Sequence, residues 1–402
     1  MAAGRAVALF RWYKFLRSLL FWQAVWFLYF QSQLSAAEAL VLYAIYDIAT
    51  TLLEVPSGVM SDRLGRRVTL ILSAAVALAG MLLLAAGGGF AAFALGQALL
   101  GVSMAFASGT EDSYLYETLD DAGRGEEIER ESVIAWRYGF AGLMLSAVTG
   151  GLIGYVDMAL TFWATAAALL LMLGVTLLFR EPGSSGMAPA PERRLVETGQ
   201  LRAAFATPPL RWLFVLAVLM YGYSHLPFVF GQPFILDALG RFGLAAEAPV
   251  VSGTVTAVMM AMSLLASLAA PALRARIGLA AILLLAFAIQ IGLAALLALS
   301  DSLIVIGFLV LRMVPDAISQ PFLIARIQPL LQRESRATYL SLQSLVGRIA
   351  FATSLWLASF GAADTGAMAH AEIRAILGVY ALAGIAALTG LAITRRALGP
   401  SR

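Results

Sequence analysis

Adjacent acidic residues stand inside an apolar stretch of this 402-residue sequence, where they could carry a proton. Glu111 and Asp112 follow Gly109, which leaves room for water or a ligand beside them. A carboxylate within a membrane span costs about 2.5–3.5 kcal/mol on insertion scales, so it is a functional candidate until a structural partner explains it. Neighbouring residues point about 100° apart on a helix, so only one of the two can face a cavity squarely. This pair, with Asp47 as a third candidate, predicts a proton-coupling site.

The alternative is that these acids form permanent ion pairs. One of them could bind Arg137 in the next apolar stretch, and Glu54 could pair with Arg348 as part of a gate. Arg312 and Asp316 stand at i and i+4 and can satisfy each other on a helix. An Arg312 that is not so paired would attract an anionic group of a substrate. The sequence leaves these interpretations open.

Aromatic side chains crowd two of the apolar stretches and could stack on an amphipathic or cationic ligand. Most are expected to face lipid or to lie at a membrane interface. The candidates for a substrate cavity are Trp22, Trp26, Tyr221 and Tyr223, with Arg312 and Asp316. His225 could titrate near neutral pH and joins these candidates, although a lone histidine two residues before Pro227 is more often a hydrogen-bonded structural residue.

The sequence lacks the residues that several kinds of chemistry require. The chain has no cysteine and two histidines, His225 and His370, which form no metal-binding pair. There is no nucleophile with a plausible histidine partner and no phosphate-binding glycine loop. The net charge of +3 is distributed as membrane topology would place it, which argues against nucleic acid as a partner. The sequence therefore predicts a protein that is not an enzyme, with no metal and no cofactor.

The elements that must position these residues are membrane-spanning helices. Hydrophobic residues make up 61% of the chain and charged residues 13%, against roughly 25% charged in soluble domains. Apolar runs of about 20 residues, the length that crosses a bilayer, recur from end to end. The predicted spans are 12–31, 37–60, 67–87, 91–118, 131–154, 158–179, 209–232, 249–272, 278–299, 302–329, 336–360 and 371–394. The polar stretch 181–208 is a linker between two six-span halves, 1–180 and 209–402.

The distribution of Lys and Arg sets the expected orientation. Of the 27 basic residues, Arg137, Arg312 and Arg348 lie well inside predicted spans, and only Arg241 and Arg374 lie near the face opposite the N-terminus. Basic loops are retained on the cytoplasmic side of a membrane. The first residues, with four basic side chains up to Arg17, are expected to be a cytoplasmic tail rather than a cleaved signal peptide. Both termini and the linker are predicted to be cytoplasmic, in an inner-membrane protein.

A weak internal repeat relates the two halves. At an offset of about 211 residues, Gly96 falls on Gly307 and Arg137 on Arg348. The tetrapeptide DRLG, ending at Gly65, is echoed by ARIG, ending at Gly278. Duplication of this kind indicates two pseudo-symmetric bundles with a binding site near the midplane of the membrane.

The loop between the second and third spans, GVMSDRLGRR, departs from helix chemistry. Gly58 would let another helix approach closely. Asp62 could pair with a basic side chain or a helix N-terminus, and the arginines would anchor the loop at the surface. Contacts that form and break here would close and open one side of the molecule. The gating candidates are Gly58, Asp62, Arg63, Gly65, Arg66 and Arg67.

With its place between the second and third of twelve spans, this loop resembles the signature loop of the major facilitator superfamily. The resemblance implies an all-α polytopic membrane protein with twelve transmembrane helices in two pseudo-symmetric six-helix bundles. It also implies a cavity lined mainly by spans 1, 4, 7 and 10, and transport by alternating access.

Two further stretches resemble the antiporters of that superfamily less completely. Gln97 stands where these usually have an arginine, and in GLMLSAVTGG, Ser146 and Ala147 replace a central Gly-Pro. The expected function is proton-coupled export of small amphipathic organic compounds by a monomer in the bilayer. The alternatives are an uptake symporter or facilitator for a nutrient or a siderophore-like chelate, and a membrane sensor that transports nothing.

Overall fold

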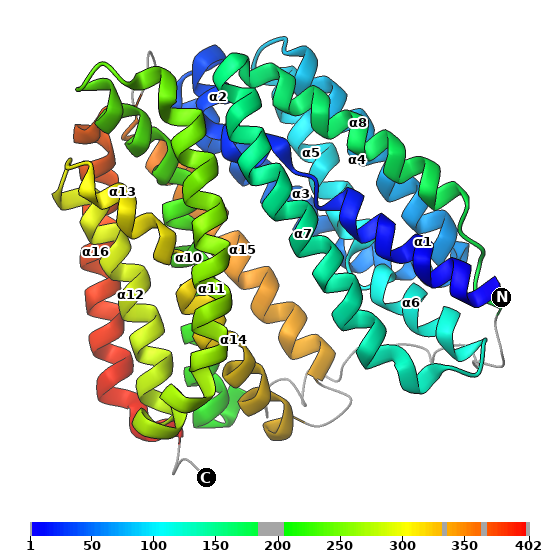
Figure 1. Ribbon diagram of the computed structural model, residues 1–402. Coiled ribbons are helices and arrows are strands. Elements are labelled where there is room, and N and C mark those ends of the chain that lie inside the picture. The colour runs from blue at the N-terminus through cyan, green and yellow to red at the C-terminus, as the bar shows by residue number, and fades with distance from the viewer. Residues whose placement is uncertain (1, 184–204, 332–335, 363–367, 399–402) are drawn as a thin grey trace. The chain divides into compact units, whose positions relative to one another are not determined.

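The computed structural model describes residues 2–183, 205–331, 336–362 and 368–398. Every regular element in these ranges is a helix, which confirms the all-α prediction (Figure 1). The chain divides into two compact units. The first unit comprises Met1–Ala188 with Pro249–Thr254, and the second comprises Pro189–Ala248 with Val255–Arg402.

The N-terminal bundle holds the helices that precede the linker. Its α-helices are α1 (Ala2–Arg17), α2 (Trp26–Gln33), α3 (Ala36–Leu64), α4 (Arg66–Ala86), α5 (Phe90–Ala107), α6 (Thr110–Asp120), α7 (Ile128–Val156) and α8 (Met158–Leu177). Short 3₁₀ turns, η1 (Phe21–Ala24) and η2 (Gly125–Glu127), connect some of them. Within this bundle α4 packs against α5 and α8, and α1 packs against α7.

The C-terminal bundle repeats this plan. Its α-helices are α10 (Pro208–Gly240), α11 (Ala248–Ile277), α12 (Leu279–Leu299), α13 (Ile304–Phe308), α14 (Val314–Ile327), α15 (Arg336–Ser359) and α16 (His370–Ile393). The 3₁₀ turns are η3 (Ala245–Glu247), η4 (Leu309–Leu311), η5 (Gln328–Leu330) and η6 (Thr394–Leu398). Within the bundle α12 packs against α10, α14 and α16.

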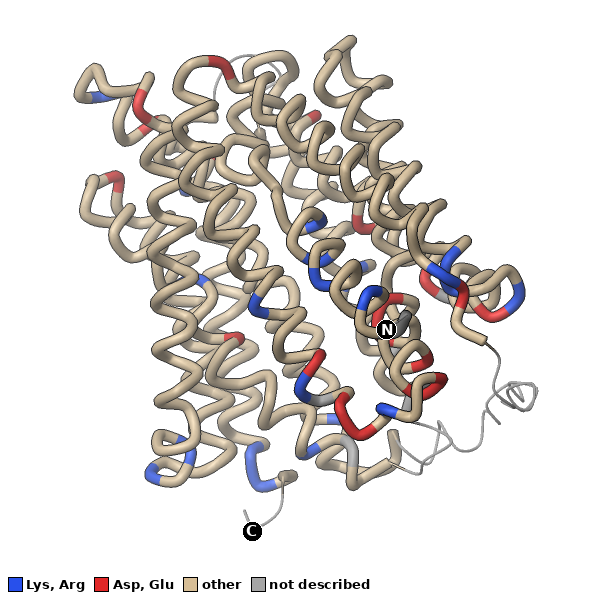
Figure 2. The backbone as a smooth tube through the Cα atoms, turned by 45° about the vertical axis from the view of Figure 1, so that its right-hand side comes forward, with Lys and Arg blue, Asp and Glu red and all other residues tan. Residues whose placement is uncertain are grey.

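Ten helices of the described residues are long and apolar enough to cross a membrane. The other two predicted spans correspond to the α1–η1–α2 segment and to α15. Figure 2 shows charged residues concentrated toward helix ends, with long uncharged stretches between them. Uncharged helical stretches of this length satisfy their own backbone groups and expose apolar side chains, as a bilayer requires.

The predicted first span, 12–31, is not one continuous helix. α1 ends at Arg17 and the chain breaks before η1, although no Gly or Pro marks the place in the sequence. The hydroxyl of Ser146 on α7 donates to the carbonyl oxygen of Ser18 at 3.3 Å. A carbonyl at the break is thus satisfied inside the bundle, which lets a broken helix exist at membrane depth.

The predicted fourth and tenth spans are also interrupted. Gly109, with φ 73°, separates α5 from α6. In the C-terminal bundle the chain passes from α13 through η4 before α14 begins. Pro315 has no N–H to offer the carbonyl of Leu311, which weakens the helix at this point. Each interruption lies close to one of the acidic residues singled out by the sequence, Glu111 and Asp316.

The predicted repeat is confirmed at the two echoing loops. Gly65 joins α3 to α4 with φ 93° and ψ 158°, and Gly278 joins α11 to α12 with φ 83° and ψ 168°. Residues that carry a side chain rarely adopt a positive φ, so glycine is required at both places. The helix that follows has 21 residues in each bundle.

Candidate functional site

Glu111 lies in the first turn of α6 and is 5% exposed. Its carboxylate accepts hydrogen bonds from Lys14 Nζ at 2.6 Å and from the Tyr13 hydroxyl at 3.0 Å. Arg17 forms a second ion pair with it. These three partners come from the last turns of α1, directly before the break in the first span. We call Tyr13, Lys14, Arg17 and Glu111 the Glu111 cluster.

The Glu111 cluster places two cations on one carboxylate. Beside it, Arg11 binds Glu131 of α7, which is 2% exposed, through two nitrogens at 2.5 and 3.1 Å. Lys14 Nζ also lies 5.4 Å from the centre of the Trp136 ring. A proton on Glu111 would remove the charge that holds Lys14 and Arg17. Protonation would therefore leave two cations able to bind an anionic group.

Sequence reasoning singled out Glu111 but not its partners. The sequence offers Arg137 as one possible partner, whereas the structure pairs Glu111 with Lys14 and Arg17 of α1. The sequence predicts a cytoplasmic tail up to Arg17, whereas in the structure Lys14 and Arg17 lie on α1, which begins at Ala2, before the predicted start of the first span at residue 12. Their i, i+3 spacing, which places both on one helical face, was the available signal.

The other acidic candidates lie in different surroundings. Asp112, next to Glu111, is exposed. Asp47 on α3 is 1% exposed, and Glu54 lies partly exposed two turns further along the same helix. The ring of Tyr43, one turn before Asp47, lies 5.5 Å from that of Trp26.

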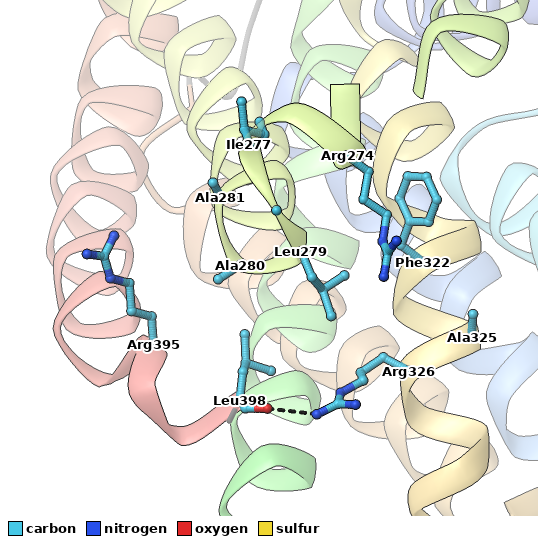
Figure 3. A pocket seen from close by; sticks show the side chains of 11 residues that line it. Arg274, Ile277, Leu279, Ala280, Ala281, Phe322, Ala325, Arg326, Arg395 and Leu398 are labelled. Carbon is cyan, nitrogen blue, oxygen red and sulfur yellow. Dashed lines mark hydrogen bonds between the residues drawn. The ribbon is translucent and has the colours of Figure 1, made fainter. Parts of the chain in front are cut away.

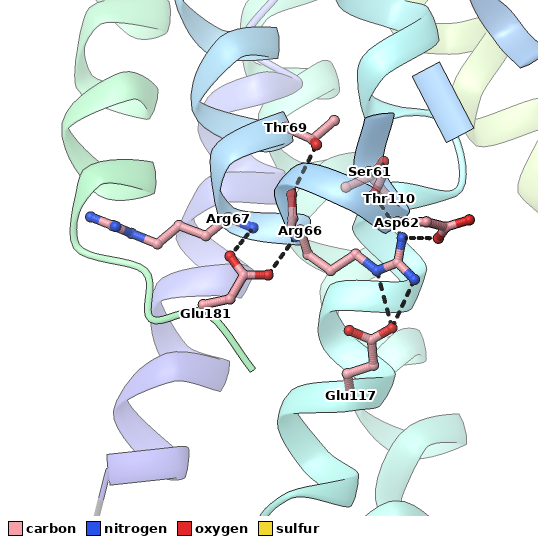
Figure 4. A network of polar contacts seen from close by, with 9 residues as sticks. Ser61, Asp62, Arg66, Arg67, Thr69, Thr110, Glu117 and Glu181 are labelled. Atoms are coloured by element: carbon pink, nitrogen blue, oxygen red, sulfur yellow. Dashed lines mark hydrogen bonds and ion pairs between the residues drawn. The ribbon is translucent and has the colours of Figure 1, made fainter. Parts of the chain in front are cut away.

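The predicted loop from Gly58 to Arg67 is helical except at Gly65, because α3 continues to Leu64 and α4 begins at Arg66. Arg66 organises the polar contacts of this segment (Figure 4). Its guanidinium donates to Asp62 at 2.7 Å and to the hydroxyl of Ser61 at 2.8 Å. It also reaches Glu117 on α6 at 3.0 Å, so one side chain joins the loop to the end of the fourth span. The predicted pairing of Asp62 with a basic side chain is thus present. Arg63 is exposed.

Glu181, which follows α8, completes this loop and was missed by sequence reasoning. Its two carboxylate oxygens accept the backbone N–H groups of Arg66 at 2.5 Å and Arg67 at 2.9 Å (Figure 4). A carboxylate here satisfies two amides that the first turn of α4 leaves without helical partners. The only feature of the sequence that pointed to Glu181 was its place directly after the sixth predicted span.

Replacing Glu181 by Ala is expected to destabilise the first turn of α4 by about 1 kcal/mol, the usual effect of losing a helix cap. Hydrogen–deuterium exchange of the protein in detergent should show faster exchange of the amides of Arg66 and Arg67. Glu126→Ala, on an exposed turn of the same bundle, is the control. Equal exchange in both variants would show that Glu181 does not cap α4.

Within the described part of the N-terminal bundle no helix packs closely against Gly58. A Cβ atom added there would have no heavy atom within 4 Å. Close packing occurs instead in the GLMLSAVTGG stretch of α7. A Cβ at Gly142 would lie 2.5 Å from the carbonyl oxygen of Phe15, and one at Gly150 would collide with the backbone of Phe21. The small residues of this stretch hold α7 against the break in the first span.

In the C-terminal bundle, a second group of polar candidates surrounds Tyr221. His225 Nδ1 lies 2.6 Å from the carbonyl oxygen of Tyr221, and the Arg348 guanidinium lies 5.6 Å from the centre of the Tyr221 ring. The Arg312 guanidinium lies 4.8 Å from the ring of Phe228.

Asp316, which the sequence allows to pair with Arg312, accepts a hydrogen bond from Gln290 Nε2 at 3.2 Å. Gln290, from α12, is 1% exposed.

Some of the aromatic candidates are buried in the core of their bundle, and others are partly exposed. Trp26 is 1% exposed, and Tyr223 is 6% exposed and donates to the carbonyl oxygen of Tyr380 at 2.6 Å. Trp22 stacks on Phe162 at 6.3 Å between ring centroids. Trp22 and Tyr221 remain partly exposed and are the stronger candidates for contact with a ligand.

Ion pairs outside the spans connect neighbouring helices. A hydrogen bond from Arg124 lowers the pKa of Glu127 between α6 and α7. A hydrogen bond from Arg241 likewise lowers the pKa of Asp301, and Arg241 also binds Asp237 at 2.6 Å. Exposed pairs of this kind contribute little to stability. Their role here is to hold the segments between helices in place.

Comparison with known proteins agrees with this architecture. The chain is similar to the nucleoside transporter NupG, at 14% identity and a TM-score of 0.76 over 97% of this chain and 99% of that one. It is also similar to a D-xylose-proton symporter, at 13% identity and a TM-score of 0.69 over 97% and 96% of the two chains.

A third similar structure is the peptide transporter POT in complex with sulfate, at 14% identity and a TM-score of 0.72 over 98% and 95% of the two chains. At these identities the likeness shows the fold alone. None of the curated proteins compared matches the chain. The sequence pattern of the Major Facilitator Superfamily matches residues 14–355. This match spans both bundles and includes the loop at Gly65, and the chain therefore belongs to the major facilitator superfamily.

Proposed function

We propose that this multi-pass transporter couples the movement of small amphipathic organic compounds to protons, with Glu111 as the proton site. Membership of the superfamily makes the chain a transporter that works by alternating access rather than an enzyme. The proposal extends to a monomer in the inner membrane with both termini cytoplasmic, as the basic residues indicate. For the direction we propose export, on the resemblance of the α7 stretch to antiporters.

The Glu111 cluster is the observation that carries the proposal. A carboxylate that is 5% exposed and held by two cations and a phenol changes its partners when it gains a proton. A site used for coupling must differ between its protonated and ionised forms in what it binds. The helix that carries each side of the cluster is interrupted next to it, by the break after α1 and by Gly109 before α6.

The same cluster favours uptake by symport as the second candidate. A proton on Glu111 frees Lys14 and Arg17, which then attract an anionic group. Proton and anion would therefore bind together and cross together. In export by exchange, the two would instead have to compete for one site.

Transport in inverted membrane vesicles with an imposed proton gradient tests the proposal. The probes are ethidium, an amphipathic cation, and taurocholate, an amphipathic anion, with a pH-sensitive dye inside the vesicles. Accumulation of a probe as protons leave the vesicles is expected for export. Flow of probe and protons in the same direction would select symport, and probe movement that ignores the gradient would exclude proton coupling. Vesicles without the protein are the control.

A further inference from the structure

A cavity of about 530 Å³ lies where α11 ends and α12 begins (Figure 3). Arg274 on α11, Arg326 on α14 and Arg395 on η6 line it. None of the described residues that line the cavity is acidic. We call it the arginine cavity.

Two of these arginines are held in place and still have donors to offer. Arg326 donates to the carbonyl oxygen of Leu398 at 2.8 Å, and the Arg274 guanidinium lies 5.4 Å from the centre of the Phe322 ring (Figure 3). The Nε atoms of Arg274 and Arg326 are buried without a hydrogen-bond partner among the described residues. Because a buried donor without an acceptor is unfavourable, the cavity is suited to a group that brings acceptors and negative charge.

The N-terminal bundle shows which group lies at the corresponding place. Gly65 and Gly278 share one backbone conformation, and α4 packs against α6 and α8 as α12 packs against α14 and α16. At Gly65 the carboxylate of Glu181, from the chain that follows α8, binds the first amides of α4. In the N-terminal bundle an anionic group therefore binds at the start of the helix that follows the glycine.

The C-terminal bundle brings basic residues to that place instead. The chain after α16 supplies Arg395 and Leu398 to the cavity, and α12 begins without a side-chain cap. Arg326 lies on α14. This helix corresponds to α6 of the N-terminal bundle, which carries Glu117. The repeat thus keeps the backbone geometry that binds an anion and replaces the acids around it by arginines.

We propose that the arginine cavity binds a phosphate-bearing anion, either the headgroup of an anionic phospholipid or free inorganic phosphate. Guanidinium groups match phosphate with paired, charge-assisted hydrogen bonds, and the first amides of a helix favour negative charge. The cavity lies where two membrane-spanning helices end, which is the depth of lipid headgroups. Bound there, the anion fixes the α11–α12 turn as Glu181 fixes the α3–α4 loop.

The test uses the full chain purified in a neutral detergent and titrated with phosphatidylglycerol, phosphatidylcholine and inorganic phosphate in turn. The midpoint of thermal unfolding reports binding, because a ligand of the folded state raises it. Phosphatidylglycerol is expected to raise the midpoint more than phosphatidylcholine. The R274Q/R326Q variant should lose at least about tenfold in affinity, since each charge-assisted hydrogen bond contributes about one such factor. R396Q, an exposed arginine of η6 that does not line the cavity, is the matched control and should bind as the natural protein does.

A response to phosphatidylglycerol without one to phosphate assigns the site to a lipid headgroup, and a response to both assigns it to the phosphate group itself. Equal binding by R274Q/R326Q and R396Q would overturn the proposal, as would equal stabilisation by the two lipids together with no response to inorganic phosphate. If R274Q/R326Q does not fold, R395Q replaces it, because this exposed side chain can be changed without disturbing packing. Unchanged affinity in R395Q would then contradict the proposal.

Discussion

Replacing Glu111 by Gln is expected to abolish proton-driven transport and to lower the free energy of unfolding by about 3 kcal/mol. Removal of one partner from a buried ion pair typically costs about 3–5 kcal/mol, because the remaining charge is left uncompensated. The side chains of Lys14 and Arg17 are 18% and 25% exposed, so partial hydration keeps the effect at the lower end of this range. Uptake into inverted vesicles measures the loss of transport, and thermal unfolding in detergent measures the loss of stability.

A second variant separates structure from coupling. Glu111→Gln with Lys14→Gln leaves the cluster with the same net charge as the natural protein, and should recover much of the lost stability. Proton coupling should stay absent, because the titrating carboxylate is gone. Asp112→Asn, at the exposed neighbouring position, is the matched control and should retain coupling. Recovery of proton-driven transport in the double variant would show that Glu111 serves only to balance charge.

Gly142→Leu is expected to destabilise the N-terminal bundle by about 2–3 kcal/mol. The first atom of the new side chain would lie 2.5 Å from the carbonyl oxygen of Phe15, a backbone atom that cannot turn aside. Overpacking of this kind costs about 1–3 kcal/mol, and here it acts directly on the break in the first span. The displacement of α1 should also separate Lys14 and Arg17 from Glu111 and reduce transport.

Gly174→Leu is the control for this substitution. Gly174 lies on α8 in the same bundle, and a Cβ added there would have no heavy atom within 4 Å. Leucine favours a helix over glycine by up to about 1 kcal/mol, so the control should be neutral or slightly stabilising. Circular dichroism during heating compares the two variants. Equal unfolding midpoints would show that α7 does not need glycine at position 142.

Much of the fold could be predicted because its signals are local. A run of apolar residues defines a span wherever it occurs, and the spacing of Gly58, Asp62 and Gly65 is read within one loop. Glu111 was found in the same way, as an acid in an apolar stretch. Where the structure differs from prediction, at the break after Arg17, no local signal is present, because the partner that stabilises the break is Ser146 on a distant helix.

The amino-acid sequence by itself determined that this chain is a two-bundle membrane protein of the major facilitator type, since burial in lipid requires long apolar helices whatever their neighbours. Only the tertiary structure decided what the charged residues do. It paired Glu111 with Lys14 and Arg17, placed Glu181 on the first turn of α4, and gathered three arginines at the α11–α12 turn. The physical reason is that an ion pair depends on distance in space, and each of these contacts joins helices that lie far apart in the chain.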